Sequence, residues 1–404
     1  MKSTQSYIKN YAKFLFAGLI LVASFNFVAD PRKFFTAVDI EGFNSEKPFI
    51  NSGGLRKLKA IEIEAGSYDT IILGTSRVLH GWNPENPAFN SSQVYNAGLA
   101  GTSIYEISRV FEFANNNLDL NQVIIGLDAI SFYSKKKSGG DYHESKFSKS
   151  YNEITFLLNE LFSKNIFFES LLTINFNFEN KYDEYISKGF LEIIDSQKYS
   201  RRKIFNDTVK EYLVREDLYP GLYDSPEQLN YLKTIFNQRK NNTKLYLFIS
   251  PIHAYQLEGM KSINSFSKFE QLKRDLVKIV AEDAKINPNK QPIALWDFSG
   301  YNSITTEEIP PGDSKKQMKW YWESSHYKKE LGDVLFDKML NYPEKAKSVP
   351  KDFGVMINSS NIESHLERIR AEQALYKQNF PEEVEEVERL ARETAHLRKP
   401  SKTN

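Results

Sequence analysis

Cysteine is absent from this 404-residue chain, and only six residues are histidine. The absence of cysteine excludes disulfides, thiolate catalysis and cysteine-ligated metals, but it fits a cytoplasmic or an extracytoplasmic protein equally well. The histidines are scattered, without the paired spacing or clustered carboxylates of a metal site. No glycine-rich loop carries the lysine that a phosphate-binding loop needs. The sequence therefore predicts no metal and no cofactor.

The chain also lacks an excess of charge of either sign. Lys and Arg total 53 against 52 Asp and Glu, a formal net charge of +1. No global field draws such a chain to nucleic acid, so we expect no nucleic-acid partner and only local recognition of charged groups. The 41% hydrophobic and 14% aromatic content supports a packed globular body.

Long hydrophobic runs are scarce, and the one that stands out is "FLFAGLILVASFNFVA", Phe14 to Ala29, near the N-terminus. As a helix, these residues cover roughly 24 Å, somewhat less than a ~30 Å hydrocarbon core. Tyr11 and Ala12 extend the run if Lys13 reaches toward the headgroups. We expect a single-pass anchor in the inner or cytoplasmic membrane, with the remaining chain outside the cytoplasm. A signal peptide cleaved near Ala23 and a buried core helix are the alternatives.

Beyond this run, short apolar segments alternate with helical patterns. Five segments predict strands: "YDTIILGTS", "SQVYNAGLAGTS", "LNQVIIGLDAI", "TKLYLFISPIHA" and "KQPIALWDFSG". Continuous apolar strands between helices predict an α/β protein, a three-layer α/β/α sandwich around a mainly parallel sheet. In such sheets the reactive groups gather at the carboxyl ends of the strands.

The pattern divides the chain into four parts. Residues about 138–242 predict a helical insertion without a strong strand signal, either plain packing against the sheet or a lid over a groove. Pro381 splits the C-terminal segment into two helices, which either pack on the domain or form an interaction arm. The parts are a membrane anchor at 1–33, a linker at 34–57, an α/β domain with its insertion at 58–345, and a C-terminal helical extension at 346–404.

Three separated motifs are candidates for a serine hydrolase-type site. Ser76 follows the first strand in "IILGTSRVLHGW", where a nucleophile would stand at a strand end. Gly98 and Gly101 in "NAGLAG" allow close backbone approach and offer N–H donors. Glu323 and His326 in "WYWESSHYKK" provide an acid and a base just ahead of a helical run. Taken singly, each motif also fits an ordinary turn or a helix cap.

Together, the order of these motifs resembles the SGNH (GDSL-type) hydrolase superfamily over roughly Tyr68 to Leu340. The likeness is greatest to its membrane-anchored branch, similar to alginate O-acetyltransferase proteins and the D-alanyl transfer protein of teichoic acid assembly. The resemblance implies an SGNH or flavodoxin-like sandwich with Ser76 as nucleophile, His326 as base and Glu323 as the acid. It implies an oxyanion hole from the N–H groups of Ser76 and of the glycine loop.

Two positions depart from that family. Glu323 stands where the family usually has Asp, a workable change because the acid need only orient and stabilise the imidazole. Asp128, after the third strand, stands where the family has an oxyanion-binding Asn, and an ionised Asp donates no hydrogen bond. Loss of such a donor costs roughly 10² to 10³ in rate. Either the N–H groups of Ser76 and Gly101 suffice for the oxyanion hole, or Asp128 has another task.

Further residues near these motifs are candidate ligand-binding groups. Arg77 would bind an anionic sugar or fix a loop, and His253 would line the pocket or serve the structure. Trp322 and Tyr327 would stack on sugar rings or pack in the core. His80 and Trp82 are either groove residues or packing residues.

These expectations combine into an extracytoplasmic, or periplasmic, acyl-transfer enzyme. Its acyl group, which we expect to be acetyl, would pass through an acyl-enzyme to hydroxyls of a cell-surface polysaccharide. The resemblance implies a membrane partner that supplies the acyl group. An esterase or polysaccharide deacetylase of the same fold and a non-catalytic carbohydrate-binding assembly protein are the alternatives.

Overall fold

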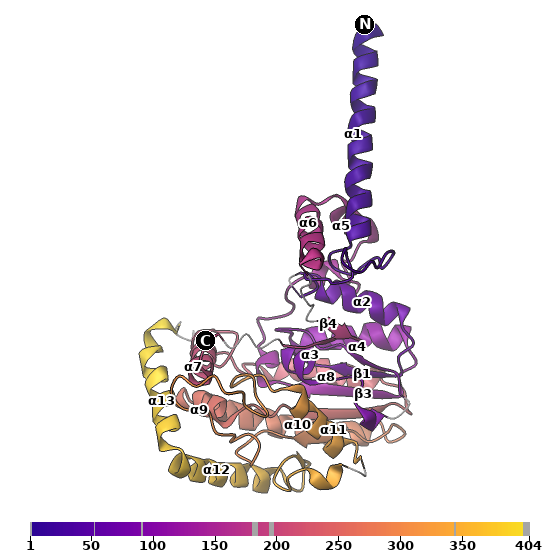
Figure 1. The fold of residues 1–404 in the computed structure, drawn as a ribbon. Helices are drawn as coiled ribbons and strands as arrows, with labels where there is room; N and C mark the ends of the chain where they lie inside the picture. The colour runs from indigo at the N-terminus through magenta and orange to yellow at the C-terminus, as the bar shows by residue number, and fades with distance from the viewer. Residues whose placement is uncertain are drawn as a thin grey trace. The chain divides into compact units, whose positions relative to one another are not determined.

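The computed structural model describes residues 2–51, 53–89, 92–179, 185–193, 198–342 and 345–398 (Figure 1). The chain divides into two compact units. Unit 1 comprises Met1–Ala65 and Gly140–Ile186, and unit 2 comprises Gly66–Gly139 and Ser187–Asn404. Each unit is therefore built from two stretches that are far apart in sequence.

Unit 1 begins with the long apolar helix α1 (Lys2–Ala29). Its segment Thr4–Ala29 is long and apolar enough to cross a membrane, a property that a signal sequence at this position would share. The residues from Thr4 to Leu21 are all exposed, whereas Asn26 and Ala29 near the end of the helix are buried. The expected N-terminal apolar helix is therefore present, and only its last turns contact other parts of unit 1.

Those last turns pack against α5 (Glu153–Phe162) and α6 (Lys164–Phe178). Ser163 joins the two helices, and its side chain accepts a hydrogen bond from Asn165 N at the start of α6. Such a serine satisfies one of the N–H groups left without a partner in the first turn. Unit 1 also contains α2 (Leu55–Ala65), which packs against the short 3₁₀ segment Tyr142–Glu144.

Unit 2 is built on a six-stranded sheet in the order β2-β1-β3-β6-β7-β8. Five strands pair in parallel and β8 joins β7 antiparallel, so the predicted mainly parallel α/β sheet is confirmed. Ile72 pairs with both Asn96 and Ile124, which sets the register across the first three strands. The strands are β1 (Thr70–Leu73), β2 (Val94–Asn96), β3 (Gln122–Leu127), β6 (Lys244–Ile249), β7 (Ala294–Asp297) and β8 (Val355–Met356).

The five parallel strands follow the order 2-1-3-4-5 when they are numbered among themselves. The chain therefore moves outward from β1 in one direction to β2 and in the other direction to β3. Loops at the carboxyl ends of β1 and β3 diverge at such a reversal and leave a crevice, where ligands of open α/β sheets bind. Ser76 and Asp128 lie just beyond these two strand ends.

Helices surround the sheet in groups. The helix α4 packs against α8 and α8 against α10, while α13 packs against α7 and α9. These helices are α3 (Ser76–Gly81), α4 (Ile104–Asn117), α7 (Arg201–Val214), α8 (Leu229–Gln238), α9 (Ala254–Ser262), α10 (Phe266–Ile286), α11 (Lys329–Met339), α12 (Ile362–Asn379) and α13 (Pro381–Glu393). The remaining 3₁₀ turns are Pro87–Phe89, Ala129–Phe132, Pro226–Gln228, Ala346–Ser348 and Ala395–Leu397.

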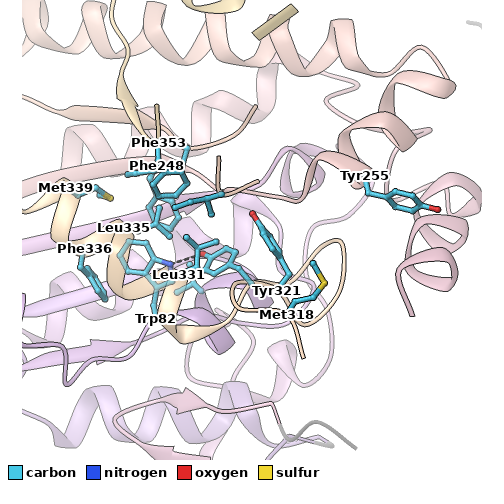
Figure 2. Packing of buried hydrophobic residues seen from close by; sticks show 14 of the residues in the cluster. Trp82, Phe248, Tyr255, Met318, Tyr321, Leu331, Leu335, Phe336, Met339 and Phe353 are labelled. Atoms are coloured by element: carbon cyan, nitrogen blue, oxygen red, sulfur yellow. Dashed lines mark hydrogen bonds between the residues drawn. The ribbon is translucent and has the colours of Figure 1, made fainter. Parts of the chain in front are cut away.

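The core of unit 2 centres on Trp82, which follows α3 (Figure 2). Its ring stacks on Phe248 of β6 at 4.3 Å between ring centroids and meets Phe336 of α11 edge-on at 4.2 Å. The indole Nε1 donates a hydrogen bond of 2.7 Å to the hydroxyl of Tyr327. Burying large aromatic rings in this way stabilises the fold by several kcal/mol, on the order of 2 per ring. The cluster holds α3, and with it Ser76, against the sheet.

The structure differs from the sequence-based boundaries in two places. The predicted insertion at about 138–242 is divided between the units, and it contains the short strands β4 (Tyr185–Ser187) and β5 (Phe190–Leu191). Strands of two or three residues carry no periodicity that a sequence pattern can reveal. The predicted linker at 34–57 ends inside α2, because this helix starts at Leu55 and belongs to unit 1.

Candidate active site

Ser76 is the first residue of α3 and follows β1 through a tight turn at Gly74. Gly74 has φ +156°, and a Cβ there would lie 2.3 Å from the Val78 side chain, so the turn requires glycine. Thr75 caps the helix, its side chain accepting a hydrogen bond from Arg77 N at 3.2 Å. The backbone thus places the Ser76 side chain at the carboxyl end of β1. Its own N–H lies in the first turn of α3, where no intrahelical acceptor exists.

Glu323 and His326 lie on a tight loop that precedes α11. Trp322 N donates to the His326 carbonyl oxygen at 3.0 Å, and Tyr321 and Tyr327 form an isolated antiparallel bridge beneath the loop. Both tyrosines are fully buried. The Glu323 carboxylate accepts hydrogen bonds from Ser325 N at 2.6 Å and from His326 N at 2.9 Å. The loop therefore fixes the acid relative to the histidine before any substrate binds.

The structure brings Ser76, His326 and Glu323 together across 250 residues of sequence. The distance between Ser76 Oγ and His326 Nε2 is 2.7 Å, and His326 Nδ1 is hydrogen-bonded to Glu323 Oε1. The His326 side chain is 25% exposed, so solvent reaches it. This arrangement has the connectivity of a nucleophile, a base and an orienting acid.

Glu323 is the negatively charged group that orients the His326 imidazole in this arrangement. Burial by itself would raise the pKa of the Glu323 carboxyl, but the adjacent His326 imidazole and the backbone N–H donors outweigh it and lower the pKa. The carboxylate is therefore ionised at neutral pH and accepts a hydrogen bond from His326 Nδ1–H. Nε2 is then left to accept the proton of Ser76.

Asp128 and Arg77 form a buried ion pair behind these residues. Arg77 Nη1 lies 2.5 Å from Asp128 Oδ1, and Thr75 donates its hydroxyl hydrogen to Asp128 Oδ2. Both carboxylate oxygens are thus occupied as acceptors, and an ionised carboxylate supplies no proton to an oxyanion. In this structure Asp128 anchors the turn before Ser76, a task other than binding an oxyanion.

Arg77 connects that turn to the loop of the acid and the base. Its Nε donates to the Ser325 carbonyl oxygen at 2.8 Å, and its Nη2 donates to Ser325 Oγ at 2.9 Å. The hydroxyl of Tyr212 lies 2.7 Å from the same Oγ. Burial would lower the pKa of the Arg77 guanidinium, but the Asp128 charge raises it, so Arg77 stays charged. At 4% exposure Arg77 positions the loop rather than facing an exposed ligand groove.

The glycine loop contacts α3 directly. A Cβ on Gly98 would lie 2.5 Å from Leu79 N, so glycine permits the close approach of this loop to the helix that carries Ser76. The Gly98 N–H donates to Asn96 Oδ1 at 2.9 Å, which leaves it engaged within the loop. Gly101 has φ +61°. The N–H groups of Ser76 and Gly101 remain the predicted oxyanion donors.

The other predicted ligand residues differ in exposure. His253 is completely buried, with Nδ1 accepting from Tyr255 N at the start of α9 and Nε2 bonded to the Glu307 carbonyl oxygen at 2.7 Å. Burial lowers the pKa of His253 to about 4, so its ring is neutral at pH 7. Tyr327 is fully buried as well, whereas Trp322 is partly exposed, with Lys328 Nζ 4.5 Å from its ring. Trp322 is therefore the one of these three that offers a surface to a sugar.

His80 lies beside His326, although the sequence alone indicated only a groove residue or a packing residue. Its ring lies edge-on to the His326 ring at 6.1 Å, and its Nδ1 is bonded to the Leu191 carbonyl oxygen at 2.8 Å. The signal was present in the sequence, because residues four apart on a helix share a face and His80 is four residues after Ser76. The contributions of Tyr212 and Ser325 had no such local signal.

No protein-family model matches this chain, and no match was found among curated proteins or solved structures.

Proposed function

We propose that this chain is a membrane-anchored serine O-acyltransferase that acts outside the cytoplasm. The observation that carries the proposal is the hydrogen-bonded set Ser76–His326–Glu323 at the carboxyl end of β1. The order of the motifs and their strand context, which resemble the SGNH hydrolases, support a three-layer sandwich of that type. The long apolar helix α1 supports attachment to the inner or cytoplasmic membrane.

In the first half-reaction, Ser76 Oγ attacks the carbonyl carbon of an acyl donor while His326 Nε2 takes the hydroxyl proton. The developing oxyanion accepts hydrogen bonds from the N–H groups of Ser76 and Gly101. The tetrahedral intermediate then collapses. The bond to the leaving group breaks, His326 returns the proton to that group, and an ester between the acyl group and Ser76 remains. Glu323 stabilises the imidazolium that exists between the two proton transfers.

In the second half-reaction, a hydroxyl group of a polysaccharide attacks the acyl-enzyme. His326 Nε2 now takes the proton of this hydroxyl and returns it to Ser76 Oγ as the ester bond to the serine breaks. The product is an O-acylated sugar, and acetyl is the acyl group we propose. Trp322, with its partly exposed ring, is the side chain we propose for stacking on the acceptor. A membrane protein would supply the acyl group, as the resemblance implies.

A second candidate function is hydrolysis of an ester by the same groups. The 25% exposure of the His326 side chain favours it, because water can reach the base as readily as a sugar hydroxyl can. An esterase or polysaccharide deacetylase would follow the same first half-reaction and use water in the second.

The test is a burst experiment on the full chain in detergent with a chromogenic acetyl ester. The wild-type chain should release about one equivalent of phenol before steady turnover, and Ser76→Ala should abolish the burst. The matched control is Ser303→Ala, an exposed serine whose hydroxyl bonds to Asp352 and to no imidazole. An oligosaccharide acceptor that speeds turnover and leaves as acetylated product selects transfer over hydrolysis. A burst that survives in Ser76→Ala refutes Ser76 as the nucleophile. No phenol release above background by the wild-type chain, with no further loss in Ser76→Ala, refutes both enzymes and favours a non-catalytic carbohydrate-binding protein.

A further inference from the structure

The helix α6 of unit 1 carries polar residues on its buried face and apolar residues on its exposed face. Three of its four buried residues, Ser170, Thr173 and Asn177, are polar and at most 2% exposed, and the fourth is Ile166. The exposed side chains include large apolar ones, Phe168 (51%), Leu171 (44%), Leu172 (55%) and Phe178 (81%). A helix on the surface of a water-soluble domain has the opposite distribution. The arrangement suits an apolar environment around α6.

The neighbouring helix α5 shows this inversion in part, because its buried residues are the apolar Phe156 and the charged Glu160. Its buried positions include the charged Glu160, which is 2.6 Å from Lys57 Nζ and 3.6 Å from Arg32 Nη1. Large apolar side chains face outward instead. They are Ile154, Leu157, Leu158 and Phe162, each between 37% and 69% exposed. Together with those of α6 they form an apolar surface, called here the hairpin face, and soluble monomers rarely expose so many large apolar side chains together.

On the inner side, the Ser170 hydroxyl and the Leu161 backbone are hydrogen-bonded to α1, whereas Asn177 bonds to Glu46. Asn26 of α1 is fully buried, and its Nδ2 donates to the Leu161 carbonyl oxygen at 2.9 Å. Ser170 Oγ donates to Asn26 Oδ1 at 3.1 Å. Polar side chains that bond between helices, with apolar side chains outside, are typical of helices packed within a bilayer.

The depth of this contact follows from the length of α1. Its uncharged stretch, Phe14 to Ala29, is 16 residues long. As a helix it covers roughly 24 Å, less than the ~30 Å hydrocarbon core. All of it must therefore lie in the membrane if α1 spans, including Asn26. Since Asn26 contacts both Leu161 and Ser170, the end of α5 and the first half of α6 lie at the same depth as the last turns of α1.

We propose that the α5–α6 hairpin enters the bilayer beside α1 and that its hairpin face contacts lipid acyl chains. Continuity with α1 selects lipid as the occupant, because the hairpin packs on the part of the helix that the membrane must enclose. The chain would then be held by one spanning helix and one hairpin inserted into a single leaflet. The proposal rests on α1 as a spanning helix and does not depend on the acyl-transfer function.

The absence of native cysteine allows single-cysteine probes in the full chain. Leu158→Cys and Leu171→Cys place an environment-sensitive fluorophore on the hairpin face. Leu21→Cys on the exposed side of α1 is the positive control, and Leu375→Cys, a 57% exposed leucine on α12, is the matched control in unit 2. Each protein is reconstituted in phosphatidylcholine vesicles with and without lipids that carry a quencher on the acyl chain. The quencher should affect positions 158 and 171 about as strongly as position 21, and several-fold more strongly than position 375.

Two results would overturn the proposal. Quenching at position 21 combined with only the weak quenching of position 375 at both hairpin positions would mean that the face is exposed to water or covered by a protein. No quenching at position 21 would remove the spanning helix on which the inference depends. Ester turnover is measured on the same proteins and on the wild type, so hairpin quenching without turnover in any of them would count against the proposed function alone.

Discussion

Two carboxylate–histidine pairs of unit 2 contain the same chemical groups in different surroundings. Glu323 and His326 are 13% and 25% exposed at their side chains, and the imidazole faces the hydroxyl of Ser76. Asp297 and His365 are 0% and 3% exposed, with 2.8 Å between His365 Nε2 and Asp297 Oδ2. The first pair is open to solvent, and the second is sealed within the protein.

The partners of each acid explain the difference. Asp297 Oδ2 lies 2.7 Å from Lys273 Nζ, and Oδ1 accepts a hydrogen bond from the hydroxyl of Ser299 at 2.6 Å. Burial would raise the pKa of Asp297, but the Lys273 ammonium and the His365 hydrogen bond lower it well below its usual range. A serine, an acid and a histidine are thus close together in both places. What separates a candidate catalytic set from a structural one is a hydroxyl that faces the histidine in a place open to solvent.

The largest expected effect comes from replacing the two histidines in turn. His326→Ala should lower ester turnover about 10⁴-fold, because no base remains for Ser76. His365→Ala should leave turnover per folded molecule within about twofold and lower the unfolding free energy by about 2 kcal/mol. Steady-state kinetics and urea unfolding in detergent measure the two quantities. Similar kinetic losses in both variants would break the distinction between the pairs.

The acid of the open pair should be the next most sensitive position. Glu323→Gln keeps the shape of the side chain but removes the charge that holds His326 Nδ1–H, and we expect kcat to fall about 10³- to 10⁴-fold. Glu323→Asp retains the charge with a shorter reach and should lie between Gln and the wild type. A glutamine variant as active as the wild type would reduce Glu323 to a residue that only shapes the loop.

The sealed pair should instead control stability. Asp297→Asn leaves Lys273 buried without its carboxylate, and we expect the unfolding free energy to fall by about 3 kcal/mol. The double variant with Lys273→Met should recover part of this loss, since no unpaired buried charge remains. The urea unfolding midpoints of the wild type, Asp297→Asn and the double variant measure these changes in stability. An unchanged midpoint in Asp297→Asn would show that the ion pair adds nothing to stability.

A third histidine, His253, should make the stability of the protein depend on pH. His253 is buried and bonded to backbone groups through both ring nitrogens, and its folded-state pKa of about 4 lies below the ordinary value of about 6.5. The unfolded chain therefore binds this proton more readily. The contribution of neutral His253 to the unfolding free energy is complete above about pH 6.5 and is lost as the pH falls toward 4. At pH 5.5 the unfolding free energy should be lower by about 1 kcal/mol.

His253→Asn should remove this dependence, because asparagine can still cap α9 without titrating in this range. Unfolding free energies of wild type and variant, measured between pH 7 and pH 4.5, should show a shallower slope for the variant. Equal slopes for the wild type and the variant would contradict the assignment of this pH dependence to His253.

Much of the fold was predictable because the signals are local. Each of the five parallel strands is a short apolar run between turn residues, and α1 is a long uncharged stretch. The antiparallel strand β8 has only two residues and gave no signal. The grouping of Ser76, Glu323 and His326 was predicted from motif order, whereas the pairing of Asp128 with Arg77 required the contacts of the folded chain.

The sequence by itself determined the apolar N-terminal helix, the alternating α/β pattern and the residue types available for serine chemistry, since these depend on composition and short-range periodicity. Only the tertiary structure decided that His326 faces Ser76 while His365 is sealed beside Lys273, that His80 stands next to His326, and that α5 and α6 expose their apolar faces. The exposure of a side chain and its hydrogen-bond partners depend on how segments far apart in sequence pack together. The local pattern of one segment does not predict that packing.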